Sequence, residues 1–123
     1  MKNKCKAVLL TLLATVSVGL SSCKTDYSSC EFIGSSGTKY IWMDMYGALG
    51  QGFRFDPDGT GKWAAATTTT SIDYPLTYTL TKKEEVYYVT FQVEGQNNKG
   101  EGYFAMKSGR RAFIIGESIH YAV

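Results

Sequence analysis

The chain has 123 residues, which leaves room for one domain and no second hydrophobic core. Three of its 13 basic residues, Lys2, Lys4 and Lys6, lie in the first six positions, so the rest of the chain carries 10 bases and 11 acids. No basic stripe is left there for a nucleic-acid partner, and we exclude that class of partner.

The first 22 residues have the pattern of a removable signal peptide. A basic start, Met1 to Lys6, precedes an apolar run from Ala7 to Leu20. This run is shorter than the roughly 20 residues that cross a bilayer as a helix. It therefore predicts a helical signal peptide over residues 1–22 rather than a permanent anchor.

Leu20, Ser21, Ser22 and Cys23 end the apolar run, and together they resemble a bacterial lipobox. The resemblance implies cleavage before Cys23, acylation of that cysteine, and attachment to the membrane through this lipid. Lys24 differs from the Asp that follows the cysteine in inner-membrane retention signals, so the resemblance favours the outer membrane, on either face. An ordinary secretory signal cut near Ser22 is the alternative.

The cysteines sort by position. Cys5 lies in the leader and Cys23 is the predicted lipid site, which leaves Cys30 without an intramolecular disulfide partner. A lone cysteine of this kind is most often a small buried hydrophobe, and we expect this of Cys30. Intermolecular pairing or a reactive thiol is the alternative.

A short polar stretch, Lys24 to Ser29, predicts a tether over residues 23–29, followed by a single domain over 30–123. Beyond the tether, helical periodicity gives way to alternation, with turn signals about every eight to twelve residues. The first candidate strands are Cys30 to Ile33 and Thr38 to Tyr46.

The clearest local signal is a hairpin from Gly52 to Trp63. Its turn reads Asp-Pro-Asp-Gly, in which Pro57 suits the first corner of a type I turn and Gly59 the position with φ > 0. The turn lacks the Gly and Glu spacing of a calcium loop, and we predict no metal there. One face of the hairpin is predicted to carry Phe53, Phe55, Trp63 and Ala65.

The same alternation continues to the end of the chain. Further strands are predicted at residues 74–81, 85–94, 102–107, 111–115 and 119–123. About eight strands joined by short links predict an all-β antiparallel meander that closes into a small barrel or half-barrel. Closure would remove the exposed edges that an open sheet leaves.

The Gly52 to Trp63 hairpin also resembles the Phe-x-x-Asp-Gly-Thr hairpin of small lipocalin-like domains in Bacteroidota lipoproteins. The Tyr-rich strand, charged turn and Tyr-Val-Thr-Phe strand that follow are similar to those domains. The similar pattern of strands and turns extends over residues 38–121, whereas the sequence motif covers only the hairpin. The resemblance implies a lipocalin-like barrel, in a class of domain whose ligand is often unknown.

The sequence carries no catalytic or metal-binding motif. His120, the only histidine, is expected to point toward solvent, because its neighbours Ile119 and Tyr121 take the inward register. A His120–Cys30 dyad would need an orienting group as well. Neither zinc-ligand spacing nor a Gly-x-Ser-x-Gly elbow is present. We therefore predict a non-enzymatic protein without a cofactor or metal.

Aromatic residues are the one suggestive signal, since all 9 Tyr, 6 Phe and 2 Trp follow the leader. Their simplest role is core packing. Inward rings would alternatively line a pocket for a small amphipathic ligand. The predicted pocket consists of Trp63, Tyr78, Tyr87 and Tyr121. The predicted exposed patch, for a protein or glycan partner, consists of Tyr40, Trp42 and Tyr46.

These features predict a lipid-anchored binding module of the envelope that holds a small apolar ligand or an envelope partner. The alternative is an inhibitor or accessory subunit of an envelope complex. Tethered barrels that inhibit lysozyme carry a Ser-Gly-x-x-Tyr pattern. Here Ser108-Gly109 is followed by Arg110, Arg111 and Ala112, so the Tyr is missing.

Overall fold

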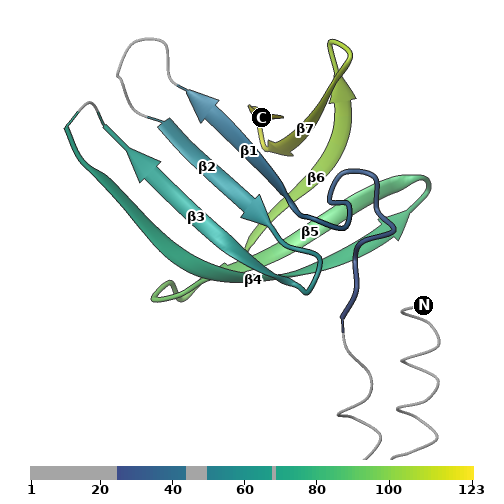
Figure 1. Ribbon diagram of the computed structural model, residues 1–123, viewed down its shortest axis with the longest axis horizontal. Coiled ribbons are helices and arrows are strands. Elements are labelled where there is room, and N and C mark those ends of the chain that lie inside the picture. The colour runs from purple at the N-terminus through teal and green to yellow at the C-terminus, as the bar shows by residue number, and fades with distance from the viewer. Residues whose placement is uncertain (1–24, 44–49, 68) are drawn as a thin grey trace, which may run out of the picture.

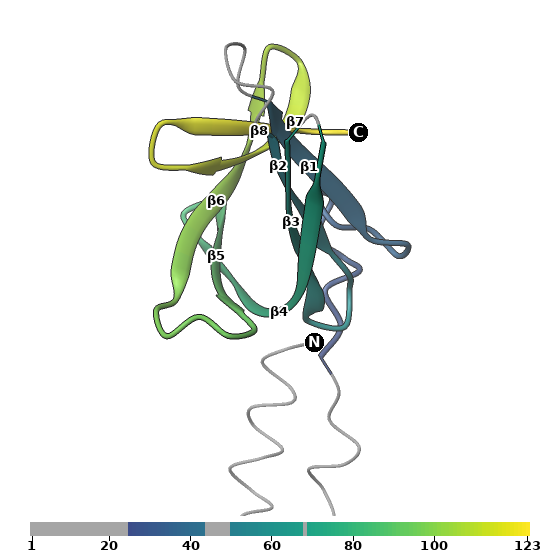
Figure 2. The same ribbon diagram turned by 90° about the vertical axis from the view of Figure 1, so that its left-hand side faces the viewer.

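In the computed structural model, the described residues are 25–43, 50–67 and 69–123. They form eight antiparallel strands, each paired with its sequence neighbours, and β1 also pairs with β8 to close a barrel (Figure 1, Figure 2). The strands are β1 (Thr38–Met43), β2 (Gly50–Phe55), β3 (Thr60–Ala66), β4 (Ser71–Lys83), β5 (Val86–Val93), β6 (Gly100–Lys107), β7 (Arg110–Ile115) and β8 (Ser118–Ala122).

The predicted all-β meander of about eight strands is thus confirmed, in its closed form. The predicted signal peptide, the lipobox and Cys23 lie outside the described residues. Within the described ranges, none of the structure is a helix with the length and apolar character needed to cross a bilayer.

The hairpin of β2 and β3 follows from its sequence. Phe53 pairs with Trp63, the Asp56 amide donates to Thr60 O at 2.8 Å, and Gly59 has φ 89°. A positive φ at this corner is strained for any residue with a Cβ, so glycine is required there. Thr60 donates to Asp58 Oδ1 at 2.6 Å and stabilises the turn from the side chain.

The long strands β4 and β5 follow the predicted alternation over most of their length. Leu76 and Leu80 of β4 are buried, as are Val89 and Phe91 of β5. Tyr74 is 41% exposed, because β4 extends past the end of β5 at this point. Its ring stacks on Trp63 with the two centroids 6.0 Å apart.

Aromatic rings fill the centre of the barrel. Phe55 and Phe113 are fully buried, with ring centroids 4.9 Å apart, and Phe53 lies edge-on to Phe91 at 5.1 Å. A side chain at Gly100 would overlap the Phe91 ring, so β6 makes room for the rings with glycine. The simplest reading of the aromatic residues, core packing, therefore accounts for most of the interior.

Residues 25–37 cover one end of this barrel, and the predicted strand Cys30 to Ile33 is wrong. These residues form consecutive turns, in which the amides of Ile33 and Gly34 both donate to Cys30 O. No sheet edge is free to pair with them, because β1 already pairs with both β2 and β8. Their apolar side chains instead seal the barrel, with Phe32 stacked on Phe104 at 5.3 Å.

Cys30 is 2% exposed and free, which confirms the prediction of a small buried hydrophobe. Burial raises the pKa of its thiol, so the protonated, unreactive form is favoured at neutral pH.

The predicted tether is too long, because Tyr27 belongs to the core. Its side chain is 5% exposed, its ring lies 5.2 Å from that of Tyr78, and its hydroxyl accepts from the Leu80 amide at 3.2 Å. The Tyr27 amide also donates to Pro57 O at 2.7 Å. Tyr27 therefore fixes the chain to the barrel before the predicted domain boundary at residue 30.

Candidate functional site

The two ends of the barrel differ in shape. Residues 25–37, dark blue in Figure 1, cover the end at which the β2–β3, β4–β5 and β6–β7 hairpins turn, and we call it the closed end. The opposite end includes the β5–β6 and β7–β8 connections. It contains a hollow of about 390 Å³, which we call the mouth.

The mouth has an apolar floor and a polar rim. Phe53, Trp63, Phe91, Val93 and Ile115 provide the apolar surface. Gln51, Gln96, Asn98 and Lys99 provide amide groups and one ammonium group. This combination suits a small ligand that is part apolar and part polar.

A chain of hydrogen bonds crosses the wall of the mouth. Trp63 Nε1 donates to Gln51 Oε1 at 3.1 Å, and Gln51 Nε2 lies 3.0 Å from His120 Nε2. His120 Nδ1 lies 3.1 Å from Phe113 O, which can only accept. The proton of the neutral imidazole therefore sits on Nδ1, and Nε2 accepts from the Gln51 amide.

The expectation that His120 points toward solvent is wrong, since its exposed fraction is 0%. His120 pairs with Phe113 across β7 and β8, so the two side chains share the inner face. Burial lowers the pKa of His120, opposed by the weaker effect of the hydrogen bond to Phe113 O. The imidazole is therefore neutral at neutral pH.

A His120–Cys30 dyad is not assembled. Cys30 belongs to the segment that covers the closed end, whereas His120 bonds Gln51 in the mouth. Both ring nitrogens of His120 are engaged by Gln51 and Phe113 O.

The four residues of the predicted pocket do not gather in one place. Trp63 lines the mouth. Tyr78 lies in the core and donates its hydroxyl to Asp56 O, and burial raises its pKa. Tyr87 packs against Phe32 at the closed end, with the ring centroids 6.2 Å apart.

Tyr121, the fourth member, is on the outside of the barrel. It pairs with Ile41 and Ala112, while its neighbour His120 takes the inner face. The Arg110 guanidinium lies over its ring, 4.6 Å from the centroid. The sequence predicted that Ile119 and Tyr121 face inward. In the structure they face outward, and His120 between them faces inward.

The predicted surface patch is also wrong, for a similar reason. Tyr40 has an exposed fraction of 0%, and it donates its hydroxyl to Phe32 O. Trp42 is half-buried, with its ring 6.4 Å from that of His120, and Tyr46 lies outside the described residues. The even-numbered side of β1 faces inward, and the 39% exposed Ile41 lies on the outer face.

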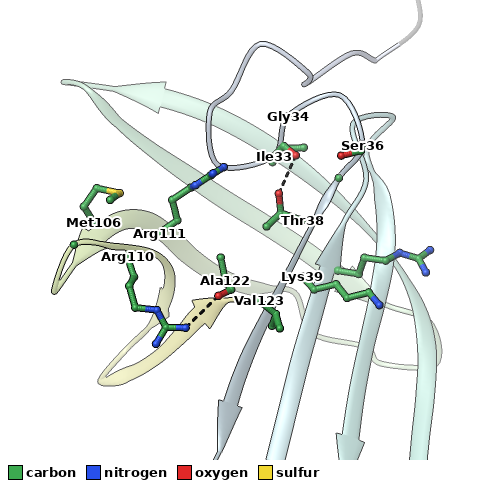
Figure 3. A pocket seen from close by; sticks show the side chains of 13 residues that line it. Ile33, Gly34, Ser36, Thr38, Lys39, Met106, Arg110, Arg111, Ala122 and Val123 are labelled. Atoms are coloured by element: carbon green, nitrogen blue, oxygen red, sulfur yellow. Dashed lines mark hydrogen bonds between the residues drawn. The ribbon is translucent and has the colours of Figure 1, made fainter.

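A second hollow, of about 740 Å³, borders the closed end on the outside of the barrel (Figure 3). Its lining has four cationic side chains and no Asp or Glu side chain, and we call it the basic groove. The four cationic residues are Lys39, Arg54, Arg110 and Arg111.

Sequence reasoning missed this groove, because its bases come from strands that are far apart in the chain. Lys39 is on β1 and Arg54 on β2, while Arg110 and Arg111 begin β7. Only the pairing of β8 with both β1 and β7 brings them to one side of the barrel.

No three His, Cys, Asp or Glu side chains of the described ranges gather closely enough to hold a metal ion. No protein-family model, no curated protein and no solved structure matches the chain.

Proposed function

We propose that this chain is a lipid-anchored, non-enzymatic binding protein of the bacterial outer membrane, and that the mouth of its barrel binds a small amphipathic ligand. The observation that carries the ligand part is the hydrogen-bonded chain from Trp63 through Gln51 to His120 beside an apolar floor. Such a half-buried polar chain holds Trp63 and Gln51 in fixed orientations before any ligand arrives.

The packed interior supports the mouth, and not the barrel centre, as the binding place. Phe55 and Phe113 are fully buried and in contact, which leaves no room between them. A ligand in the mouth would instead lie on Phe53 and Phe91 and reach the amides of the rim. The Lys99 ammonium favours a ligand whose polar part is neutral or anionic.

A binding role without catalysis is supported by the state of the two groups that resemble a nucleophile and a base. Burial raises the pKa of the Cys30 thiol and lowers that of the His120 imidazole. The thiol lies at the closed end and the imidazole at the mouth, so neither activates the other.

The anchor is supported by the lipobox resemblance of residues 20–23 and by the signal-peptide pattern before it. The lipocalin-like resemblance of the hairpin at Gly52 to Trp63 points to the same kind of envelope protein. Mass spectrometry of the protein purified from its cells tests the anchor. We expect an acyl mass on Cys23 in the natural chain and none in Cys23→Ser.

Native mass spectrometry of the same preparation tests the mouth. We expect a small-molecule adduct that is lost in Trp63→Ala, because this change removes both floor and hydrogen-bond donor. Tyr88→Ala is the matched control, since Tyr88 is a ring of β5 with 45% exposure, outside the mouth. The proposed ligand site is wrong if no adduct is found, or if both variants lose it equally.

A second candidate function, an accessory subunit of an envelope complex, is favoured by an apolar row on the outer face. Tyr88 is exposed, and Tyr103 and Ile119 are half-buried, in a row across β5, β6 and β8, with the buried Ile114 of β7 between the last two. Side chains on such a row suit a protein partner. Cross-linking from Tyr88 in whole cells that traps one envelope protein, and that stops in Tyr103→Glu, would favour this role over the mouth.

A further inference from the structure

The link between the proposed lipid and the barrel is short. Only Lys24, Thr25 and Asp26 separate Cys23 from Tyr27, which is fixed in the core. An extended chain spans at most about 3.6 Å per residue, so the Cα atoms of Cys23 and Tyr27 lie within about 15 Å of each other. An acyl chain on Cys23 would therefore hold the barrel close to the bilayer, because no long flexible linker separates the two.

The same link selects which end of the barrel meets the membrane. Thr25 lies beside Gly59 in the β2–β3 turn, since a Cβ added to Gly59 would be 3.3 Å from Thr25 Cγ2. That turn belongs to the closed end, where the Tyr27 amide also bonds Pro57 O. The first described residue, Thr25, is therefore at the closed end, two positions after Cys23 in the sequence.

The basic groove lies at this end. Its wall reaches the same turn, because a Cβ added to Gly37 in the groove would be 2.9 Å from Asp56 Oδ1. Figure 3 shows Arg110, Arg111 and Lys39 around the hollow, below the chain segment that carries Ile33 and Gly34. Thr25 and the groove therefore both border the β2–β3 turn.

Most of the positive charge of the groove is uncompensated by carboxylates. Arg54 forms an ion pair with Asp56 at 3.0 Å. Arg111 donates to Glu31 O at 2.7 Å and Arg110 to Ala122 O at 3.3 Å, and both of these acceptors are neutral carbonyls. Across the described residues, neither these two arginines nor Lys39 forms an ion pair with Asp or Glu.

We propose that the closed end rests on the bilayer and that the basic groove binds the phosphate-bearing headgroups of anionic lipids. This inference rests on the lipid anchor proposed above. Guanidinium groups present forked donors that match phosphate oxygens. A basic side chain near an anionic surface favours the bound state by about fivefold. Arg110 is already ordered by its place over Tyr121, so little conformational freedom is lost on binding.

The opposite end carries the complementary signal. Among the described residues, Glu94, Glu101 and Glu117 lie at or next to the strand ends around the mouth, together with the base Lys99. An anionic surface repels this end and attracts the other, so the mouth faces the aqueous side. The orientation keeps the mouth accessible to its ligand while the acyl chain is inserted.

Quenching by spin-labelled lipid headgroups tests the orientation. The full chain is acylated in cells, purified and reconstituted into phosphatidylcholine vesicles with or without 30% phosphatidylglycerol, a test composition of about one anionic lipid in three. A fluorophore is attached to Ser36→Cys in the groove or to Glu117→Cys near the mouth. The buried Cys30 takes up no label in the folded protein.

We expect strong quenching at position 36 and weak quenching at position 117. Phosphatidylglycerol should increase the difference, and salt of about 1 M should remove that increase, because it shortens the screening length to about 3 Å. Lys39→Glu with Arg110→Glu should abolish the effect of phosphatidylglycerol. Lys62→Glu with Lys83→Glu is the matched control, with the same change in net charge outside both the groove and the mouth, and should keep most of the phosphatidylglycerol effect.

The outcomes separate the two proposals. Protein without an acyl mass on Cys23 would overturn the anchor, and this inference with it. Acylated protein with equal quenching at both positions would overturn the orientation alone. Quenching at position 36 that responds neither to phosphatidylglycerol nor to Lys39→Glu with Arg110→Glu would show a bilayer-facing closed end whose groove binds no headgroups, and would overturn the proposed lipid site.

Discussion

The two ends of one barrel are built in opposite ways. At the closed end, Phe32 stacks on Phe104 with an interplanar angle of 7°, and its carbonyl accepts the Tyr40 hydroxyl. At the mouth, the inner wall carries Gln51 and His120 in place of further rings. The sealed end contributes stability and a fixed start for the chain. The mouth keeps oriented polar groups, of which Gln51 lines the hollow and His120 is buried behind it.

This contrast has a physical reason. A barrel of eight strands has an interior just wide enough for side chains to fill it. The rings of Phe53, Phe55 and Phe113 occupy that space in the middle, and the hollow of the mouth lies at one end. Residues 25–37 cover one end, and the hollow that we propose as the ligand site lies at the other. Truncating the cover and perturbing the mouth should therefore have very different effects.

The largest effect is expected from Phe32→Ala at the closed end. Phe32 is 6% exposed, and its removal leaves a cavity over Phe104, so the free energy of unfolding should fall by about 3–5 kcal/mol. Urea denaturation measures the change. Tyr88→Ala on the outer face should cost much less, and equal losses in the two variants would contradict the role of Phe32 as a cover.

A smaller effect is expected from Tyr40→Phe, which deletes only the hydroxyl that donates to Phe32 O. The carbonyl is left buried without this donor, and the free energy of unfolding should fall by about 1–3 kcal/mol. Thermal and urea unfolding measure it. Tyr103→Phe, on the outer face, is the control that deletes the same atom. An equally large loss of stability in that variant would contradict a stabilising role for the Tyr40–Phe32 hydrogen bond.

The smallest effect concerns the mouth, and it depends on pH. Burial lowers the pKa of His120 in the folded chain below its ordinary 6.5. At a pH between the folded pKa and 6.5, the unfolded chain therefore binds the proton and the folded chain does not. Stability is therefore highest above pH 6.5 and is lost as the pH falls toward the folded pKa. Protonation of His120 Nε2 would also place two hydrogen-bond donors, this nitrogen and the Gln51 amide, opposite each other.

Thermal unfolding at pH 7.5 and pH 5.5, about one unit on either side of this ordinary pKa, measures the loss. It should be absent in His120→Gln, because the chain has no other histidine. The carboxyl of Asp58 has a lowered pKa through hydrogen bonds from Thr60, so its contribution is lost only below its ordinary 3.8, outside this window. A pH dependence unchanged in His120→Gln would contradict the buried imidazole.

The sequence by itself determined the class of fold through local rules. The turn at Pro57 and Gly59 needs only the residues within it, and the alternation of β4 and β5 needs only the two faces of a strand. The number of strands and their antiparallel order followed from such signals. These features depend on contacts between chain neighbours, which is why sequence patterns contain them.

Tertiary structure alone decided which face of an ambiguous strand is inside. In β1, rings alternate with Ile41 and Met43, so both sides are apolar and the pattern has no preferred side. Packing against Phe55 and Phe104 turned Tyr40 inward. In β8 the polar His120 went inside because Gln51 of another strand supplies its hydrogen bond, a partner 69 residues away that no local pattern contains.

The ends of the barrel were decided in the same way. Cys30 to Ile33 has the composition of a strand, but closure of β1 on β8 left no edge for it, and its side chains became the cover. The basic groove exists because closure places Arg110 beside Lys39. Composition and alternation reflect contacts between chain neighbours, whereas closure joins distant parts of the chain, so local structure was predictable and the make-up of the two barrel ends was not.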